Sequence, residues 1–352
     1  MKRRPSRRIY LGQVPIGDGA PIAVQSMTNT DTRDVEATVA QIKRLEEAGC
    51  EIVRVAVPDR EAAQALRRIK EKIRIPLIAD IHFDHRLALE ALAAGVDGLR
   101  INPGNIGGPQ ALKRVAREAA ERGVPIRVGV NAGSLEKEVM EAYGGITAEA
   151  MVASALRSIR LLEDLGFFNI KVSLKASEVP LMVEAYSLLA EKVDYPFHLG
   201  VTEAGLPLPG AVKSAVGLGI LLSRGLGDTI RVSLTGDPVL EVEVAYHILR
   251  SLGLRQRGVE IISCPTCGRC QIDLERLAAE VEHKLRGVAR PLKVAVMGCA
   301  VNGPGEARRA DVGIAGGRGW GTVFRRGEVI KRVPESELVE ALLEEIHKIV
   351  EE

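Results

Sequence analysis

The chain is poor in aromatic residues, in net charge and in long apolar runs. Aromatics make up 3% of its 352 residues, and the formal net charge is +2. Proteins that bind nucleic acid usually combine stacking aromatics with a strongly basic surface, so we expect no nucleic-acid partner. A membrane-spanning helix needs roughly 20 apolar residues in a row, so we also expect no membrane segment. The basic residues from Met1 to Arg8 are followed by no signal-peptide core, and we expect them to form a solvated tail.

Cysteine is also scarce, and it is unevenly placed. Four of the five cysteines lie between residues 264 and 299. This clustering does not resemble a secreted disulfide framework, and it favours the reducing cytoplasm. The remaining one, Cys50, follows an apparent helix end, so we expect a packed structural thiol.

Short apolar runs alternate with longer amphipathic ones from about residue 20 onward, and many of the latter end in a capping glycine. Eight such units predict a (β/α)8 barrel over residues 1–253. A doubly wound open sheet is the alternative, but no G-x-G-x-x-G follows the first strand. The predicted strands are Ile22–Met27, Ile52–Val57, Pro76–Ile81, Gly98–Ile101, Pro125–Val130, Asn169–Lys175, His198–Val201 and Thr229–Thr235.

The pattern changes after Leu252, and residues 254–352 predict a second, smaller α/β domain. We expect the stretch Gly316–Gly321, which does not match a phosphate-binding motif, to be a loop. The other predicted elements are strands Val259–Ser263, Leu292–Met297 and Asp311–Ala315, helices Asp273–Leu285 and Glu335–Glu351, and a hairpin over Thr322–Val333.

Basic residues interrupt the apolar strands of the predicted barrel. A buried charge is costly unless it is paired, and residues near the carboxyl ends of barrel strands face the active site. Several cations there predict an anionic ligand, of which a phosphate or diphosphate is the natural choice. Internal pairing with acids such as Glu51, Asp80 or Glu203 is the alternative, but it would need as many buried acids. The cations are Arg54, Arg100, Arg127, Lys171, Lys175 and Arg231.

Polar residues follow the same strands. Asp80 and His82 are two residues apart, so they share one side of an extended segment. We expect ligand binding or proton transfer from them rather than metal ligation. Asn102, Asn131 and the pair Thr202-Glu203 follow three further strands.

The clustered cysteines predict a metal site. Cys264 and Cys267 form a C-x-x-C motif after one predicted strand, and Cys299 follows another. Two thiolate-bearing loops side by side fit tetrahedral zinc or an iron–sulfur cluster. The spacing leaves the fourth ligand open between Cys270 and an oxygen donor such as Glu306. On spacing alone, Glu306 is better explained as a surface acid beside neighbouring arginines.

Several blocks of sequence resemble the 4-hydroxy-3-methylbut-2-enyl diphosphate synthase family of the methylerythritol phosphate pathway to isoprenoids. Cys264-Pro-Thr-Cys267-Gly-Arg and Gly298-Cys299-Ala-Val-Asn-Gly-Pro-Gly-Glu306 carry the resemblance in the second domain. The matching blocks of the barrel are Ala79–Asp84, Leu99–Gly107, Val128–Glu136, Val172–Ser177 and His198–Gly205.

The resemblance implies a [4Fe–4S] cluster held by Cys264, Cys267, Cys299 and a displaceable Glu306. It implies reductive ring opening and dehydration of 2-C-methyl-D-erythritol 2,4-cyclodiphosphate, with electrons from a flavodoxin or ferredoxin. It also implies a homodimer in which one subunit's cluster domain covers the other subunit's barrel. The absence of a large domain between the two units resembles the bacterial form of the family. Cys270 is an additional thiol that the family motif does not require.

The resemblance also assigns roles in the barrel. Glu203 would be the proton donor. The residues that would hold the diphosphate and its ring are Arg54, Arg100, Arg127, Asn131, Lys175 and Arg231. The residues that would line the rest of the site are Asp80, His82, Asn102, Thr202 and Ser233.

Two other functions compete with this one. The first is a zinc-stabilised (β/α)8 enzyme of the pterin-binding type, which transfers a group without redox chemistry. The second is a metal-binding module without catalysis, which the polar strand ends argue against.

Overall fold

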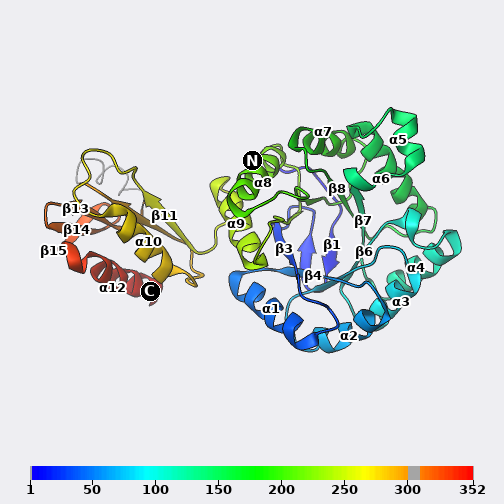
Figure 1. Cartoon of the computed structure of the whole chain (residues 1–352), viewed down its shortest axis with the longest axis horizontal. Helices are drawn as coiled ribbons and strands as arrows, with labels where there is room; N and C mark the ends of the chain where they lie inside the picture. The colour runs from blue at the N-terminus through cyan, green and yellow to red at the C-terminus, as the bar shows by residue number, and fades with distance from the viewer. Residues whose placement is uncertain (1, 300–309, 352) are drawn as a thin grey trace. The chain divides into compact units, whose positions relative to one another are not determined.

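The computed structural model describes residues 2–299 and 310–351. It divides into two compact units, Met1–Arg255 and Gln256–Glu352. In the first unit, eight parallel strands lie in the order β8-β7-β6-β5-β4-β3-β10-β9, and a bridge between Val172 and Phe197 joins the two outermost strands. The predicted (β/α)8 barrel is therefore confirmed (Figure 1). Its strands are β3 Ala23–Met27, β4 Ile52–Ala56, β5 Leu77–Asp80, β6 Gly98–Ile101, β7 Ile126–Asn131, β8 Ile170–Lys175, β9 His198–Leu199 and β10 Thr229–Ile230.

Helices surround the barrel, as Figure 1 shows. Local signals set their ends: α1 begins after Asp34, whose carboxylate accepts a hydrogen bond from the Ala37 N–H, and ends at Gly49 with φ of +99°. An extra helix, α5, lies between β7 and α6. The helices are α1 Val35–Ala48, α2 Arg60–Lys70, α3 His85–Ala93, α4 Pro109–Glu121, α5 Lys137–Tyr143, α6 Ala148–Glu163, α7 Val179–Ala190, α8 Pro207–Ser223 and α9 Pro238–Ser251, with 3-10 turns η1 Pro103–Asn105 and η2 Ala132–Ser134.

A short hairpin closes the amino-terminal end of the barrel. Its strands, β1 Ile9–Leu11 and β2 Val14–Ile16, were not predicted from the sequence. Apolar side chains of the hairpin form one cluster with Ala23, Ile52 and Ile78 from the first half of three barrel strands. The barrel is thus plugged with apolar side chains at this end.

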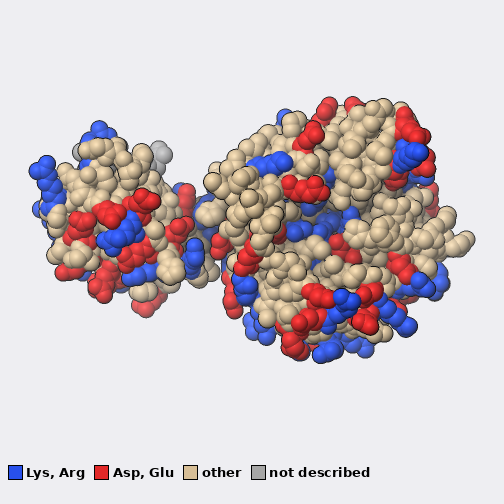
Figure 2. Space-filling view, viewed as in Figure 1, with Lys and Arg blue, Asp and Glu red and all other residues tan. Residues whose placement is uncertain are grey.

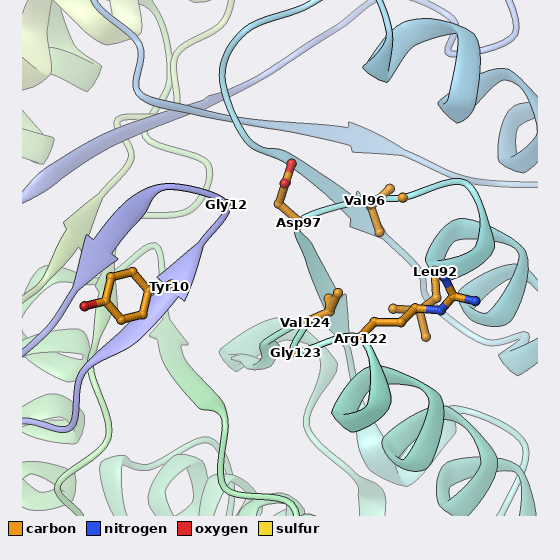
Figure 3. A pocket seen from close by; sticks show the side chains of 9 residues that line it. Tyr10, Gly12, Leu92, Val96, Asp97, Arg122, Gly123 and Val124 are labelled. Carbon is orange, nitrogen blue, oxygen red and sulfur yellow. The ribbon is translucent and has the colours of Figure 1, made fainter.

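A hollow of about 320 Å³ lies beside the hairpin, lined by residues that include Tyr10, Asp97 and Arg122 (Figure 3). Asp97 directly precedes β6, so the hollow belongs to the amino-terminal end of the strands. The side chains of a (β/α)8 active site lie at the opposite end.

The basic N-terminal segment contradicts the expectation of a solvated tail. Arg3 forms an ion pair with Asp228 at 2.8 Å. Arg4 donates to the carbonyl oxygens of Val193 and Tyr195, at 2.7 and 2.5 Å, and its guanidinium stacks over the Phe197 ring. These partners are distant in sequence, so no local pattern could indicate that the segment docks on the barrel.

In the second unit, the described residues form a five-stranded sheet and the two helices α10 and α12. Its strand order is β11-β12-β13-β14-β15, with β11 to β13 parallel and the last two pairs antiparallel. Apolar residues of both helices share one cluster with the sheet. Across the described parts of the chain, no helix is long and apolar enough to span a membrane. The elements are β11 Val259–Ser263, α10 Leu274–Leu285, β12 Leu292–Met297, β13 Val312–Gly317, β14 Trp320–Arg325, β15 Glu328–Pro334, η3 Glu335–Glu337 and α12 Leu338–Glu351.

The loop predicted at Gly316–Gly321 is wrong, because most of this stretch is strand. Gly316 pairs with Gly321 across β13 and β14, and Gly317 pairs with Trp320. A Cβ at Gly316 would lie 2.6 Å from the side chain of Ile272, and one at Gly321 would lie 2.7 Å from that of Leu338. The glycines therefore serve close packing on the sheet, which a composition-based prediction reads as a turn.

Candidate active site

The cations predicted from the barrel strands are gathered inside the barrel. Arg54, Arg100, Arg127, Lys171 and Lys175 are each at most 8% exposed. Their register places them side by side on neighbouring strands: Arg100 pairs with Arg127, and Arg127 pairs with Lys171. Because side chains alternate along a strand, residues two apart share one face of it. Figure 2 shows basic side chains in the middle of the barrel unit, inside its outer ring.

Asp80 is the acid shared by two of these cations. Its carboxylate lies 3.6 Å from Arg54 Nε and 3.4 Å from Arg100 Nη1. Burial alone would raise the pKa of Asp80, but the nearby Arg54, His82 and Arg100 hold it well below its usual range. Asp80 is therefore ionised and holds the two guanidinium groups in place.

Glu241 on α9 is a second buried acid, and it was not predicted from the sequence. It accepts hydrogen bonds from Arg231 at 3.4 Å, from Ser26 Oγ at 3.0 Å and from the Leu234 N–H at 3.0 Å. One sequence feature could have predicted that Glu241 is buried: it lies on the apolar face of a helical pattern, four residues before the buried Ala245. A buried acid on such a face needs a cation, which here is Arg231.

The remaining cations have no acid partner within the described residues. Neither Arg127, Lys171 nor Lys175 forms an ion pair there, and Arg127 Nε and Nη1 and Lys171 Nζ have no hydrogen-bond partner. Burial, followed by the neighbouring cations, lowers the pKa of all three groups well below the usual values. Six basic residues thus share the two buried carboxylates of Asp80 and Glu241. This excess of basic groups over acidic ones fits a multiply charged anion.

Two glycines on the inner face make room for the cations. A Cβ at Gly129 would lie 3.0 Å from Arg100 Nε, and one at Gly200 would lie 2.7 Å from Lys175 Nζ. Any larger residue at these two positions would displace a charged side chain. The packing explains why a glycine interrupts each of these otherwise apolar strand segments.

The polar residues at the strand ends surround the cations at the more open end of the barrel. His82 has a 56% exposed side chain and lies 3.1 Å from Arg100 through Nε2. Asn102 is half-buried, and its Oδ1 accepts a hydrogen bond from the Gly104 N–H, so part of its role is to shape the following turn. The other half-buried side chains predicted for the site are Asn131, Thr202, Arg231 and Ser233.

Glu203 has an unusual backbone. Its φ is +52°, a left-handed conformation that non-glycine residues seldom adopt, and its side chain is exposed. The segment is held at both ends, because Thr202 N donates to Ala176 O at 3.2 Å and Thr235 N donates to Gly205 O at 3.0 Å. Strain of this kind is frequently found at functional sites, where it directs a side chain.

In the second unit, the structure brings the two cysteine-bearing segments together. β11 and β12 are parallel neighbours with Ser263 opposite Val296, so Cys264 and Cys299 follow the same edge of the sheet. The Gly298 N–H donates to Cys264 Sγ at 3.3 Å. The N–H of Arg269 lowers the pKa of the exposed Cys267.

Cys270 has a packing role in this structure. Its thiol donates to the Ile272 carbonyl at 3.2 Å, and its sulfur lies 2.4 Å from where a Cβ of Gly298 would be. Cys50 is buried as expected, and burial raises the pKa of its thiol to about 12.

The donor set suits a soft metal. All five cysteines are free thiols, and an N–H group directed at Cys264 sulfur is a feature that stabilises the reduced state of iron–sulfur clusters. Over residues 2–299 and 310–351, no three His, Cys, Asp or Glu side chains are grouped closely enough to hold a metal ion. The predicted ligand Glu306 lies outside the described residues. The cysteines thus fit the chemistry of a cluster without forming a complete ligand set by themselves.

Two family models match the chain, one for each unit. The GcpE TIM-barrel domain matches residues 6–246, and the GcpE protein C-terminal domain matches residues 260–348. The chain belongs to the GcpE family. A relative from Thermodesulfovibrio yellowstonii is 62% identical over 349 residues, covering 99% of this chain and 100% of its own. One from Caldanaerobacter subterraneus subsp. tengcongensis is 61% identical over 350 residues, covering 99% of both chains. Both are named 4-hydroxy-3-methylbut-2-en-1-yl diphosphate synthase (flavodoxin).

Solved structures confirm the barrel. Dihydropteroate synthase from Stenotrophomonas maltophilia, with imidazole bound in its active site, superposes with a TM-score of 0.52 at 16% identity. The match covers 70% of this chain and 98% of that one. At so low an identity the likeness concerns the fold alone, so it does not support the alternative of a pterin-type enzyme.

Proposed function

We propose that this chain catalyses the reductive ring opening and dehydration of 2-C-methyl-D-erythritol 2,4-cyclodiphosphate to (E)-4-hydroxy-3-methylbut-2-enyl diphosphate, a step of isoprenoid biosynthesis. The observation that carries the proposal is the excess of buried positive charge in the barrel of a GcpE-family chain. The names of the relatives support the same product and a flavodoxin as electron donor. A ferredoxin is the alternative donor.

The diphosphate is bound by five basic residues of the barrel, two of which lack an acid partner. Arg127 and Lys175 supply the charge that no buried carboxylate offsets. Arg54 and Arg100 are oriented by Asp80, and Arg231 by Glu241, so their remaining N–H groups are free to meet phosphate oxygens. Hydrogen bonds from charged donors to phosphate are short and strong, and fixed guanidinium groups make them specific.

The uncharged polar groups bind the rest of the ring. Asn131 lies level with Lys175 across β7 and β8 and is half-buried, so its amide is available to a ring oxygen. Asn102, Thr202 and Ser233 supply further amide and hydroxyl groups. Asp80 and His82 complete the lining, with His82 held beside Arg100.

Glu203 is the proton donor in this proposal. Loss of water requires a proton at the departing oxygen, and an exposed carboxyl group held by a strained backbone can deliver it.

Cys264, Cys267 and Cys299 hold a [4Fe–4S] cluster, with Glu306 as the fourth, displaceable ligand. When bound, the cluster would pass on the two electrons of the reduction one at a time, as the flavodoxin or ferredoxin delivers them. A carboxylate is a hard ligand on a soft metal centre, so Glu306 is exchanged more readily than a thiolate. In the homodimer that the family resemblance implies, the active site is shared between the subunits.

Anaerobic purification tests the proposal. We expect a brown protein with acid-labile sulfide and about four irons per chain. Given a reduced flavodoxin, it converts the cyclic diphosphate to the linear allylic diphosphate. A colourless protein with stoichiometric zinc and no turnover would refute the proposal.

A further inference from the structure

Lys171 is a buried basic residue that has no role in the proposed mechanism. It is the second residue of β8, four residues before Lys175, and 1% of it is exposed. An extended strand advances about 3.3 Å per residue, so Lys171 lies deeper in the barrel than Lys175. Lys171 pairs with Arg127 across β8 and β7, so it lies at the level of Arg127, and we expect it to act on a ligand at the carboxyl ends of the strands through that guanidinium group.

The surroundings of Lys171 are basic. The charged or titratable groups that act on it are Arg127 on β7, Arg54 on β4, His198 on β9 and, before β10, Asp228. Asp228 is already bound to Arg3 and to the Phe197 N–H. No carboxylate within the described residues is thus available to Lys171.

Several polar atoms near Lys171 also lack partners. These include Lys171 Nζ, Nε and Nη1 of Arg127, and His198 Nε2. His198 uses its other ring nitrogen, Nδ1, for a 2.8 Å hydrogen bond with Thr229 Oγ1. Polar atoms buried without partners are costly, so a cluster of them indicates that something in the functional cycle satisfies them.

We propose that Lys171 is a positioning residue that is uncharged in the substrate-free protein and takes up one proton from solvent when the diphosphate binds above it. The proposal rests on the proposed function, because it needs an anion among Arg54, Arg127 and Lys175. Before binding, a charge on Lys171 would be repelled by these cations, and its burial opposes the charged form. Once the anion offsets the charge of Arg127, the ammonium group is stabilised. No electron moves in this step.

Substrate affinity should therefore depend on pH in a defined direction. A group that gains a proton on binding weakens binding as pH rises, by up to tenfold per pH unit between its pKa values in the free and bound protein. A cyclic diphosphate carries one strongly acidic hydroxyl on each phosphorus, so the ligand itself does not titrate near neutral pH. Any protons taken up on binding are therefore bound by groups of the protein and not by the ligand.

Anaerobic calorimetry without a reductant tests the proposal. The cyclic diphosphate is titrated into the holoprotein in buffers of different ionisation enthalpy, which gives the number of protons taken up. We expect about one proton fewer for Lys171→Met than for the wild type. The matched control is Lys113→Met, which removes an exposed charge on α4 and should match the wild type.

The outcomes separate this inference from the proposed function. Absence of any binding to the wild type overturns both. Binding with equal proton numbers in the wild type and Lys171→Met overturns this inference alone. Should Lys171→Met fail to fold, the wild-type Kd between about pH 6.5 and 9 still decides, because a pH-independent Kd contradicts proton uptake by a lysine. If Lys171 were purely structural, Lys171→Met would lower the Tm and leave the number of protons taken up on binding unchanged.

Discussion

The two halves of the proposed active site are built differently. In the barrel, the cations lie within strands, where the backbone ladder and the apolar layer behind it fix each side chain. In the second unit, the cysteines lie in segments beyond the ends of β11 and β12. The basic side chains of the barrel are thus ordered without a ligand, whereas we expect the thiolates to reach their final arrangement only with the proposed metal bound.

The largest effect is expected from removing a cysteine ligand. In Cys299→Ser, a hard hydroxyl replaces a thiolate, so we expect iron and acid-labile sulfide to fall to near zero, with complete loss of turnover. The control is Cys50→Ala, since Cys50 is a buried thiol in the barrel. Iron retained at the wild-type level in Cys299→Ser would show that Cys299 is not a cluster ligand. The proposed assignment of cluster binding to the cysteine segments would then be wrong.

The next effect is expected from Glu306→Ala. The three thiolates should keep most of the iron, while turnover should fall roughly 10- to 100-fold, because the exchangeable ligand is lost. Iron analysis and single-turnover kinetics measure the two quantities separately. If turnover were unchanged, Glu306 would not be the displaceable ligand.

A smaller effect is expected from Arg127→Met. Loss of a charged hydrogen-bond donor should weaken diphosphate binding by roughly 30-fold or more. The Tm should be equal or higher, because the variant removes a buried cation without an acid partner. Arg117→Met, which removes an exposed cation on α4, is the matched control. A lower Tm with unchanged affinity would mean that Arg127 is structural. The barrel would then not hold a preformed diphosphate site at Arg127.

The smallest effect is expected from Arg4→Met. The variant loses two hydrogen bonds to carbonyl oxygens, each contributing about 1 kcal/mol, so the Tm should fall by a few degrees. Differential scanning calorimetry measures this change. Diphosphate affinity should be unchanged, because the partners of Arg4 precede β9 and lie away from the carboxyl ends of the strands. Altered affinity would contradict the assignment of the segment to a structural role.

Much of the fold followed from local pattern. Seven of the eight barrel strands were predicted to within two residues at each end, since each is an apolar run bounded by turn or capping residues. The eighth was predicted to reach Thr235, but β10 ends at Ile230. The hairpin at residues 9–16 was missed because strands of three residues show no periodicity. The docking of Arg3 and Arg4 depends on partners nearly two hundred residues away, and the strand glycines near Gly316 depend on neighbouring side chains. None of these causes is visible locally.

The site was predictable to a different extent. The presence of cations in apolar strands predicted that charges gather in the barrel, and the structure confirms that Arg54, Arg100 and Asp80 meet. Glu241 was missed because its partner is reached only when α9 packs on the barrel. Which anion binds, and whether Cys264, Cys267 and Cys299 share one cluster with Glu306, stay predictions.

One measurement tests the central claim most directly: an anaerobic crystal structure of the holoprotein with the cyclic diphosphate bound. The account predicts phosphate oxygens within hydrogen-bond distance of Arg127 and Lys175, and a cluster ligated by Cys264, Cys267 and Cys299. A diphosphate bound away from the carboxyl ends of the barrel strands, or a metal held without Cys299, would contradict it.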